Sequence, residues 1–255
     1  MMMRARAAGL PSAVVKPLGR AAPVLRPVIV TRRNAAVRAV VTSDGRRAQL
    51  STRPGQNVST AVIRECLDRL AAADVQEAVT PALTAAEAPI WTAAGFRAAT
   101  ELALLRLDLT RPRRRHRAAS VPVRRCTRRD WPSLEALDRR AFGAFWHLDA
   151  TTLADAADVT SMARVRVAGD QPVGYAICGL SDTTGYVQRL AVDPVDQGRG
   201  IASALLHDGL TWLERHGAID AYVNTEPTNE RALALYAAFG FTPERERLVV
   251  LSWRP

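Results

Sequence analysis

The sequence predicts an α/β fold, in which helices pack on a mixed sheet, and two observations support this prediction. In the second half of the chain, strand-like and helix-like segments follow one another in the order β-α-α-β-β-β-α-β-α-β. In the first half, a weaker copy of the last four of these segments recurs at a constant offset. The chain therefore reads as a tandem of two related α/β units.

The elements of the second half follow from hydrophobic periodicity and from turn residues. Residues 162–168 alternate between apolar and polar side chains, as a strand with one buried face does, and Gly169-Asp170 predicts the turn after it. Gly217 and Gly240 stand where helices should end, because glycine readily adopts the left-handed conformation of a helix C-terminus. We expect strands at 121–126, 162–168, 173–180, 185–192, 219–223 and 247–253, and helices from Asp130, at 153–157, at 201–216 and at 230–239.

The repeat is visible when the sequence is shifted by 145 residues. Gly95-Phe96 then falls on Gly240-Phe241, and Trp91 falls on Tyr236, without a gap. Between these anchors both halves read as helix, strand, helix, strand. In the first half we expect the first of these helices at 58–72 and the final strand at 101–109.

Composition excludes several classes of protein. Hydrophobic residues make up 48% of the chain and charged residues 24%, which is ordinary for a folded globular protein. Cys66, Cys126 and Cys178 are far apart and include no CxxC pair, so neither a disulfide framework nor a zinc site is expected. No apolar run reaches the roughly 18 residues that a membrane span needs. We therefore expect a cytoplasmic protein with no bound metal and no membrane partner.

The net charge of +10 is distributed unevenly along the chain. Residues 1–117 hold 20 Lys and Arg against 8 Asp and Glu, whereas residues 118–255 hold 15 against 17. The run Arg-Pro-Arg-Arg-Arg-His-Arg at 111–117 could bind phosphates by releasing their counterions, or it could be a solvated linker. We favour the linker, so nucleic acid is not an expected partner.

Residues 187–206 combine a strand, a short loop and a glycine-bearing turn that opens a helix. The first N–H groups of a helix have no partner within the helix, and the helix dipole favours negative charge at that end. Gly198 and Gly200 allow the backbone to approach a pyrophosphate closely, and Arg199 adds positive charge. This segment therefore predicts an anion site.

Two spaced motifs make this part of the chain resemble the GNAT superfamily of N-acetyltransferases. The first is [Arg/Gln]-x-x-Gly-x-[Gly/Ala], met by Gln197, Gly200 and Ala202 after a Leu-Ala-Val-x-Pro strand end. The second is Asn229-x-x-Ala-x-x-x-Tyr236-x-x-x-Gly-Phe. A dinucleotide-binding loop and a P-loop are poorer explanations, because neither GxGxxG nor Gly-Lys-Ser/Thr occurs. The resemblance implies a GNAT fold, with acetyl-CoA as co-substrate.

The resemblance also implies which residues hold acetyl-CoA. The backbone of 190–192 would pair with the pantetheine arm like an added strand, and the N–H groups from 197 to 202 would hold the pyrophosphate. Asn229 would contact the cofactor near its arm, or would only cap the helix that follows it. The expected cofactor-binding residues are Leu190, Ala191, Val192, Gln197, Gly198, Arg199, Gly200, Ile201, Ala202 and Asn229.

Acetyl transfer needs an acid for the departing thiolate and a base for the attacking amine. The resemblance implies that Tyr236 is the general acid, although its apolar helix also suits a core tyrosine. Glu226 follows a strand beside the cleft and is the first candidate for the base. The alternatives are Glu135, Asp138, His147 and Asp149. The aromatic-rich segment 142–148 either lines the acceptor pocket or forms an ordinary contact between helices.

In the first unit the matching positions carry different chemistry. The positions matched to Gln197, Asn229 and Tyr236 hold Thr52, Thr84 and Trp91. Pro54 also removes one N–H group from the loop that would hold a phosphate. We therefore expect one acetyl-CoA per chain, with the same stoichiometry for the fragment 120–255 as for the whole chain.

These observations divide the chain into four parts. We expect a disordered basic leader at 1–23, a degenerate GNAT-like unit at 24–110, a basic linker at 111–119 and a catalytic unit at 120–255. The expected function is transfer of the acetyl group from acetyl-CoA to a primary amine, on a small molecule or a protein N-terminus, by direct attack in a ternary complex. The alternative is a non-catalytic acyl-CoA-binding sensor or interaction module, and a homodimer is left open.

Overall fold

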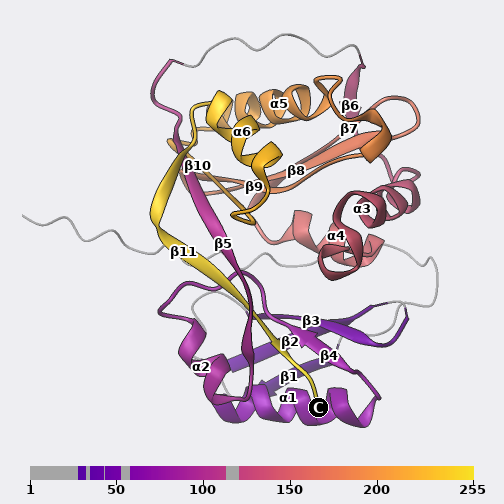
Figure 1. Ribbon diagram of the computed structural model, residues 1–255, viewed down its shortest axis with the longest axis vertical. Coiled ribbons are helices and arrows are strands. Elements are labelled where there is room, and N and C mark those ends of the chain that lie inside the picture. Colours follow the sequence, from indigo (N-terminus) through magenta and orange to yellow (C-terminus); the bar gives the residue numbers. More distant parts are fainter. Residues whose placement is uncertain (1–27, 33–34, 43, 53–57, 113–120) are drawn as a thin grey trace, which may run out of the picture.

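The structure of the protein is a computed structural model that describes residues 28–32, 35–42, 44–52, 58–112 and 121–255 (Figure 1). The predicted leader at 1–23, residues 113–119 of the predicted linker and Pro54 lie outside these residues. No described helix is both long enough and apolar enough to cross a membrane.

Within the described residues, eleven strands form one mixed sheet in the order β1-β2-β3-β4-β11-β5-β10-β9-β8-β7-β6. The strands are β1 (Val28–Arg32), β2 (Ala35–Val41), β3 (Arg47–Thr52), β4 (Glu77–Val79), β5 (Arg97–Asp108), β6 (Val123–Arg125), β7 (Met162–Ala168), β8 (Gly174–Ser181), β9 (Thr184–Val192), β10 (Asp220–Thr225) and β11 (Thr242–Trp253). The helices are α1 (Thr60–Ala72), α2 (Ala88–Ala93), α3 (Trp131–Trp146), α4 (Ala150–Asp158), α5 (Ile201–Arg215) and α6 (Glu230–Ala238). The predicted α/β class with a mixed sheet is confirmed.

The second half contains the predicted elements in the predicted order, from β6 and α3 to α6 and β11. Gly217 and Gly240 follow α5 and α6 with φ of 86° and 90°, the left-handed conformation that ends a helix. The last strand differs from the prediction, because it begins at Thr242 rather than at residue 247. Its first two residues already pair with β5, ahead of a register shift that no periodicity in the sequence reveals.

The two halves repeat one another in geometry as well as in sequence. β3 and β4 run parallel over three residue pairs with α1 between them in the chain, and β9 and β10 do the same around α5. Arg97 and Thr242, the first residues of β5 and β11, stand 145 positions apart, which is the predicted offset. Both strands are 12 residues long. The structure thus contains the repeat that the sequence predicts.

The two halves exchange their last strands. β11 lies between β4 and β5, and it pairs with β4 through Ser252 and Trp253. β5 in turn pairs with β10 of the second half, from Ala103 to Asp108. Figure 1 shows both long strands running from one half of the molecule to the other. Each half therefore completes its sheet with a strand of the other half.

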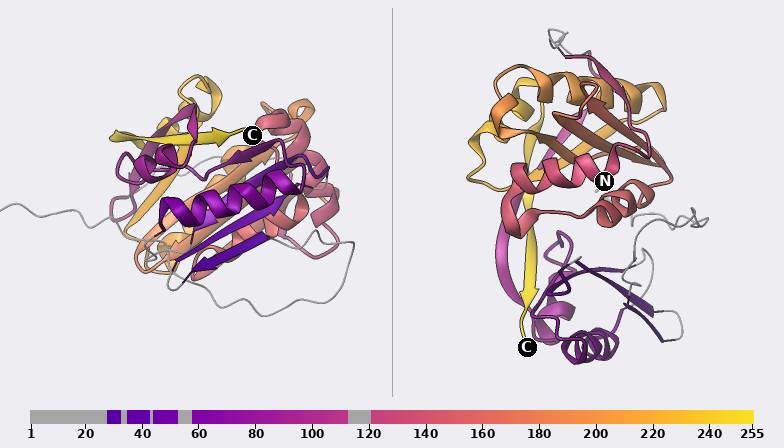
Figure 2. Two further views of the ribbon diagram at one scale, coloured as in Figure 1. Left: turned by 90° about the horizontal axis from the view of Figure 1, so that it is seen from below. Right: turned by 90° about the vertical axis from the view of Figure 1, so that its right-hand side faces the viewer.

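Helices α3 and α4 form a layer between the two halves, as Figures 1 and 2 show. On one side their apolar residues pack on β7, β8 and β9. On the other side they meet the first half, where Arg38 of β2 pairs with Asp155 of α4 at 2.7 Å. Among the described residues, the first half has no helices of its own that correspond to α3 and α4. One helix pair therefore covers both halves of the sheet.

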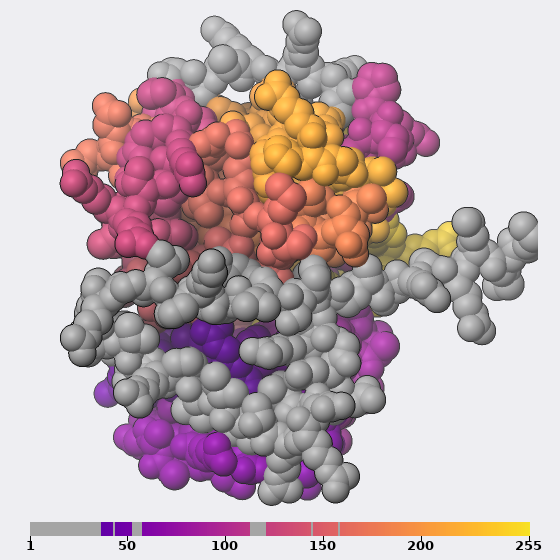
Figure 3. All heavy atoms as spheres, turned by 180° about the vertical axis from the view of Figure 1, so that it is seen from behind, coloured from indigo at the N-terminus to yellow at the C-terminus, as the bar shows by residue number. Residues whose placement is uncertain are grey.

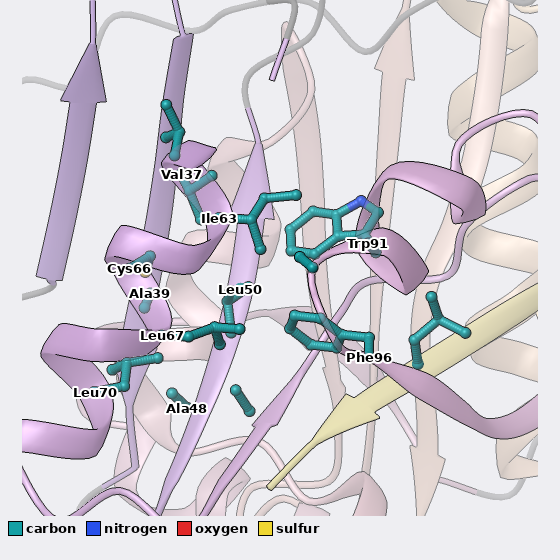
Figure 4. Close-up of a cluster of buried hydrophobic side chains, with 14 of the residues drawn as sticks. Val37, Ala39, Ala48, Leu50, Ile63, Cys66, Leu67, Leu70, Trp91 and Phe96 are labelled. Atoms are coloured by element: carbon teal, nitrogen blue, oxygen red, sulfur yellow. The ribbon is translucent and has the colours of Figure 1, made fainter. Parts of the chain in front are cut away.

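Each half keeps a core of its own on the opposite side of its sheet. In the first half, Ile63, Leu67 and Leu70 point from α1 toward the strands (Figure 4). Trp91 meets Phe96 edge to face, with ring centroids 5.3 Å apart, so the position matched to Tyr236 is a core position here. In the second half, α5 and α6 pack on a core that includes Leu105 and Leu107 of β5 and Leu109, which directly follows that strand. Figure 3 shows the first half, indigo to purple, and the second half, pink to orange, at opposite ends of the molecule.

Candidate functional site

Strands β9 and β10 run side by side only near their starts. They pair in parallel over three residue pairs, the last of which joins Tyr186 to Tyr222. The pairing of β9 with β8 then shifts register at Gln188, which is an extra residue between the partners of Cys178 and Ile177. A bulge of this kind bends a strand. The end of β9 therefore leaves β10, and the backbone of 190–192 faces a gap between the two strands.

The turn between β9 and α5 has the geometry of an anion site. Gly198 and Gly200 have φ of 79° and 77°, and a Cβ atom at either position would meet no atom within 4 Å. The first hydrogen bond within α5 runs from the Ala204 N–H to the Gly200 carbonyl, at 3.0 Å. The N–H groups of 201–203 precede it, and the first turn of α5 has no acidic residue. This turn therefore combines open space, N–H groups without helical partners and the positive end of the helix dipole.

Side chains brace this turn in a way that the sequence did not reveal. Gln197 donates to the Val192 carbonyl at 3.4 Å, and its amide oxygen accepts a hydrogen bond from Arg231 of α6. Arg199 pairs with Asp196, so part of its charge is already balanced. The sequence did not predict that Arg231 contacts Gln197, because residues 34 positions apart share no local pattern. Its guanidinium brings α6 to the same turn as α5.

Tyr236 is buried between α6 and the sheet, with 6% of its surface exposed. Its ring lies 5.5 Å from that of Phe241, in the core beneath α5 and α6. Burial raises the pKa of Tyr236 above its ordinary value near 10. The phenol therefore stays protonated at neutral pH, which suits a proton donor and excludes a base. The core position and the acid role are compatible in this geometry.

Asn229 is the N-cap of α6. Its side-chain oxygen accepts a hydrogen bond from the Ala232 N–H at 3.2 Å. The capping role that the sequence allowed is thus present, and it satisfies one of the N–H groups that a helix start leaves open. The contact of Asn229 with a cofactor stays a prediction.

Glu226 directly follows β10, on the side where β10 and β9 diverge. Its side chain is half-buried, and the described residues provide no hydrogen-bond partner for its carboxylate. Its carbonyl accepts from the Asn229 N–H at 3.0 Å, which fixes the turn between β10 and α6. The position of Glu226 after β10 is compatible with the role of a base, which stays a prediction.

Three of the four alternative bases are occupied by structural contacts. Asp138 is fully buried and accepts hydrogen bonds from the Tyr175 hydroxyl, from the Leu148 N–H at 2.7 Å and from Arg189 at 2.9 Å. Asp149 caps α4. Glu135 pairs with Arg139 at 3.0 Å and accepts from the Ala150 N–H. His147 differs from these three, because it follows α3 and its buried Nε2 has no hydrogen-bond partner among the described residues. The three carboxylates hold α3 and α4 in place. Glu226 and His147 therefore stay the candidates for the base.

The cysteines add no reactive group to this site. Cys66, Cys126 and Cys178 are free thiols, and burial raises the pKa of each of them, to about 11 for Cys66 and Cys126. A thiol with a raised pKa is a poor nucleophile and a poor metal ligand. Among the described residues, no group of three His, Cys, Asp or Glu side chains is placed to hold a metal ion.

Comparison with known proteins identifies the second half. Residues 125–241 match the family described as the acetyltransferase (GNAT) family. The chain is 43% identical over 74 residues to a mycothiol acetyltransferase of Acidimicrobium ferrooxidans, which is 29% of this chain and 24% of that protein. It is 28% identical over 214 residues to a mycothiol acetyltransferase of a Nocardioides species, which is 74% of this chain and 72% of that protein. The chain thus aligns with about a quarter of the first of these relatives.

Solved structures show the same fold over both halves. A tandem GNAT protein from the clavulanic acid biosynthesis pathway has a TM-score of 0.58 at 14% identity, and the match covers 86% of this chain and 78% of that one. A GCN5-related N-acetyltransferase from Sphaerobacter thermophilus has a TM-score of 0.56 at 17% identity, over 87% of this chain and 78% of that one. These likenesses confirm the predicted GNAT fold, while the predicted domain boundaries stay predictions. Residues 125–241 therefore form a domain of the acetyltransferase (GNAT) family.

Proposed function

We propose that this protein transfers the acetyl group of acetyl-CoA directly to a primary amine. The observation that supports this most strongly is the open glycine turn at the start of α5, beside the gap between β9 and β10. A buried and protonated phenol, Tyr236, lies on the helix that follows β10. The three cysteines are free, which agrees with a cytoplasmic protein.

The residues present fit acetyl-CoA. The N–H groups of the 197–202 turn would hold the pyrophosphate, because Gly198 and Gly200 leave space where other residues would place a Cβ atom. The backbone edge at 190–192, which does not pair with β10, would hold the pantetheine arm in the manner of an added strand. When bound, acetyl-CoA supplies an activated acetyl thioester. The brace between Arg231 and Gln197 would keep the turn closed around the phosphates.

The chain's own groups then handle the protons. Glu226 would accept a proton from the acceptor amine, directly or through a water molecule, because it follows β10 at the end where β10 and β9 no longer pair. Backbone N–H groups along the end of β9 would polarise the thioester carbonyl. Tyr236 would give its proton to the departing thiolate, which its raised pKa allows at neutral pH. Acceptor and acetyl-CoA are bound at the same time in this mechanism.

Replacing Gly200 with valine is expected to weaken acetyl-CoA binding by at least about tenfold, because a β-branched side chain strains a φ of 77° and fills the space over the turn. Gly217→Val is a matched control, since Gly217 also has a positive φ, of 86°, and no atom within 4 Å of an added Cβ. The control should lower Tm by a similar amount and leave the dissociation constant unchanged in isothermal titration. Equal affinity in both variants would contradict the assignment of the turn.

Glu226→Gln is expected to lower kcat at neutral pH by about 10²-fold, the lower range for a positioned base. The loss should shrink as the pH rises, because an amine that is already deprotonated needs no base. Glu230→Gln is the control, because it removes the same charge from a nearby residue in the exposed first turn of α6. It should leave the rate unaltered. A pH–rate profile identical to that of the unaltered protein would remove Glu226 from the mechanism.

The acceptor is the least defined part of the proposal. The names of the two mycothiol acetyltransferases favour a small molecule over a protein N-terminus as the acceptor. Small amines are therefore the first acceptors to test. A thiol-release assay with acetyl-CoA and a panel of small amines, amino acids, aminoglycosides and N-terminal peptides measures the activity. We expect release with at least one small amine. Binding of acetyl-CoA without release for any amine would instead support the alternative, a non-catalytic acyl-CoA sensor.

A further inference from the structure

The end of α3 is bent into the boundary between the two halves. Gly143 interrupts the helix with φ of 66° and ψ of −177°, and the residues after it turn away from the helix axis. We call residues 142–148 the α3 tail. Its Phe145 and Trp146 pack against Val79 of β4 and Leu102 of β5 in the first half. They also meet Leu248 and Val250 of the exchanged strand β11, so this segment of the second half rests on an apolar surface built mainly outside it.

On one side, the α3 tail is held by the strand that carries the proposed cofactor site. Arg189 of β9 donates to the Trp146 carbonyl at 2.6 Å, and its guanidinium lies 3.6 Å from the centroid of the Phe142 ring. The same guanidinium pairs with the fully buried Asp138 at 2.8 Å. Arg189 directly follows Gln188, the bulge residue where β9 leaves β10. The position of the tail is therefore tied to the point where acetyl transfer is proposed to occur.

On the other side, the α3 tail is held by the first half of the chain. Arg47 of β3 donates to the Phe145 carbonyl, and its guanidinium lies 4.7 Å from the centroid of the Phe145 ring. Glu77 of β4 lies 3.4 Å from the same guanidinium, and only 13% of the Arg47 side chain is exposed. Planar guanidinium groups suit such a double contact, because they stack on a ring and donate in the plane at the same time.

We propose that Arg47 is a positioning residue for the amine acceptor, although it belongs to the half that carries no acetyl-CoA motif. Neighbouring carbonyls of the α3 tail are bound by one arginine from each half, and the tail stands beside the bulge of β9. Arg47 holds the outer side of this segment, and Arg189 holds the inner side. The first half thereby sets one wall of the acceptor site, a role that rests on the proposed function.

A second ion pair between the halves provides a matched control. Arg38 of β2 pairs with Asp155 of α4 at 2.7 Å, and both side chains are about one-third exposed. This pair links the same two layers, yet it ends on α4 and not on the α3 tail or on β9. Arg38→Ala therefore removes an arginine and a contact between the halves while leaving the chain from Arg47 to Arg189 intact.

The first test measures backbone hydrogen exchange in the full-length protein, without any ligand. Arg47→Ala should raise exchange in peptides covering 142–148 by at least about tenfold, and Arg38→Ala should leave it unchanged, because Arg47 binds the tail whereas Arg38 pairs with α4. Arg47→Lys should give an intermediate result, since lysine keeps the charge and loses the planar double contact. If Arg47→Ala does not fold, Phe145→Leu removes the ring beneath the guanidinium and keeps the apolar packing. Unchanged exchange in the tail would overturn the proposal.

The second test uses the amine that gives the fastest thiol release in the panel described above. Arg47→Ala should raise KM for that amine by about tenfold and leave KM for acetyl-CoA within about twofold, the expected size for loss of a charge-assisted hydrogen bond. Arg38→Ala should alter neither constant. Equal changes in both constants, or no change in either, would overturn the positioning role. Absence of thiol release in the unaltered protein would overturn the proposed function, while the exchange experiment would still decide whether Arg47 orders the tail.

Discussion

A fragment comprising residues 120–255 is expected not to fold by itself, although it contains both acetyltransferase motifs. The fragment lacks β5, which pairs with β10 and with β11. It also lacks Leu105, Leu107 and Leu109, which belong to the core beneath α5 and α6. Each buried leucine contributes about 1.5–3 kcal/mol, and a domain has a total stability of about 5–15 kcal/mol. Losing all three therefore removes much of the stability of the second half.

Circular dichroism during heating measures this result, and the expected outcome is a broad transition without cooperativity. Co-expression of 1–112 with 113–255 is the control, because every strand pair is then available although the chain is cut. The two pieces should copurify and show one cooperative transition. A sharp transition for 120–255 alone would contradict the prediction. The binding stoichiometry of one acetyl-CoA is consequently best measured on the whole chain.

Tyr236→Phe is expected to lower kcat by about 10²- to 10⁴-fold, the range for removal of a positioned acid. Affinity for acetyl-CoA should stay within about twofold, because only the hydroxyl is removed. Tm should change little, since no described side chain forms a hydrogen bond with this hydroxyl and the ring keeps its contact with Phe241. Steady-state kinetics together with titration of acetyl-CoA measure both effects.

Tyr222→Phe serves as the control for Tyr236→Phe, because Tyr222 lies on β10 beside Tyr186 and has no proposed role in proton transfer. It should keep the rate of the unaltered protein. The pKa of Tyr236 lies above its ordinary value, so ionisation of this group should not reduce the rate between about pH 7 and pH 9. An unchanged kcat in Tyr236→Phe would remove the tyrosine from the mechanism.

Local features of the site could be predicted from the sequence because local rules govern them. The turn at 197–200 needs residues that tolerate positive φ, and Gly198 and Gly200 both adopt it. Asn229 caps the helix that begins after it, and Gly217 ends the helix before it, as their residue types predict. The order of strands and helices in the second half follows from periodicities of two and 3.6 residues.

Contacts between distant residues could not be predicted in this way. Asp138 had the features of a catalytic base, yet Tyr175 and Arg189 surround it because a buried carboxylate must be paired. The brace from Arg231 to Gln197 joins α6 to the turn before α5, and their approach depends on the gap between β9 and β10. No spacing in the sequence specifies these partners, since each depends on how the layers pack.

The sequence alone was sufficient for the element order, the internal repeat, the glycine turn and the family resemblance, because each depends on neighbouring residues or on recurring spacing. The exchange of β5 and β11 and the sharing of α3 and α4 depended on the tertiary structure. Two similar strands can pair within a half or across halves with nearly the same local pattern, so only the packing of the whole sheet selects one arrangement. That selection places Arg47 of the first half against the α3 tail of the second.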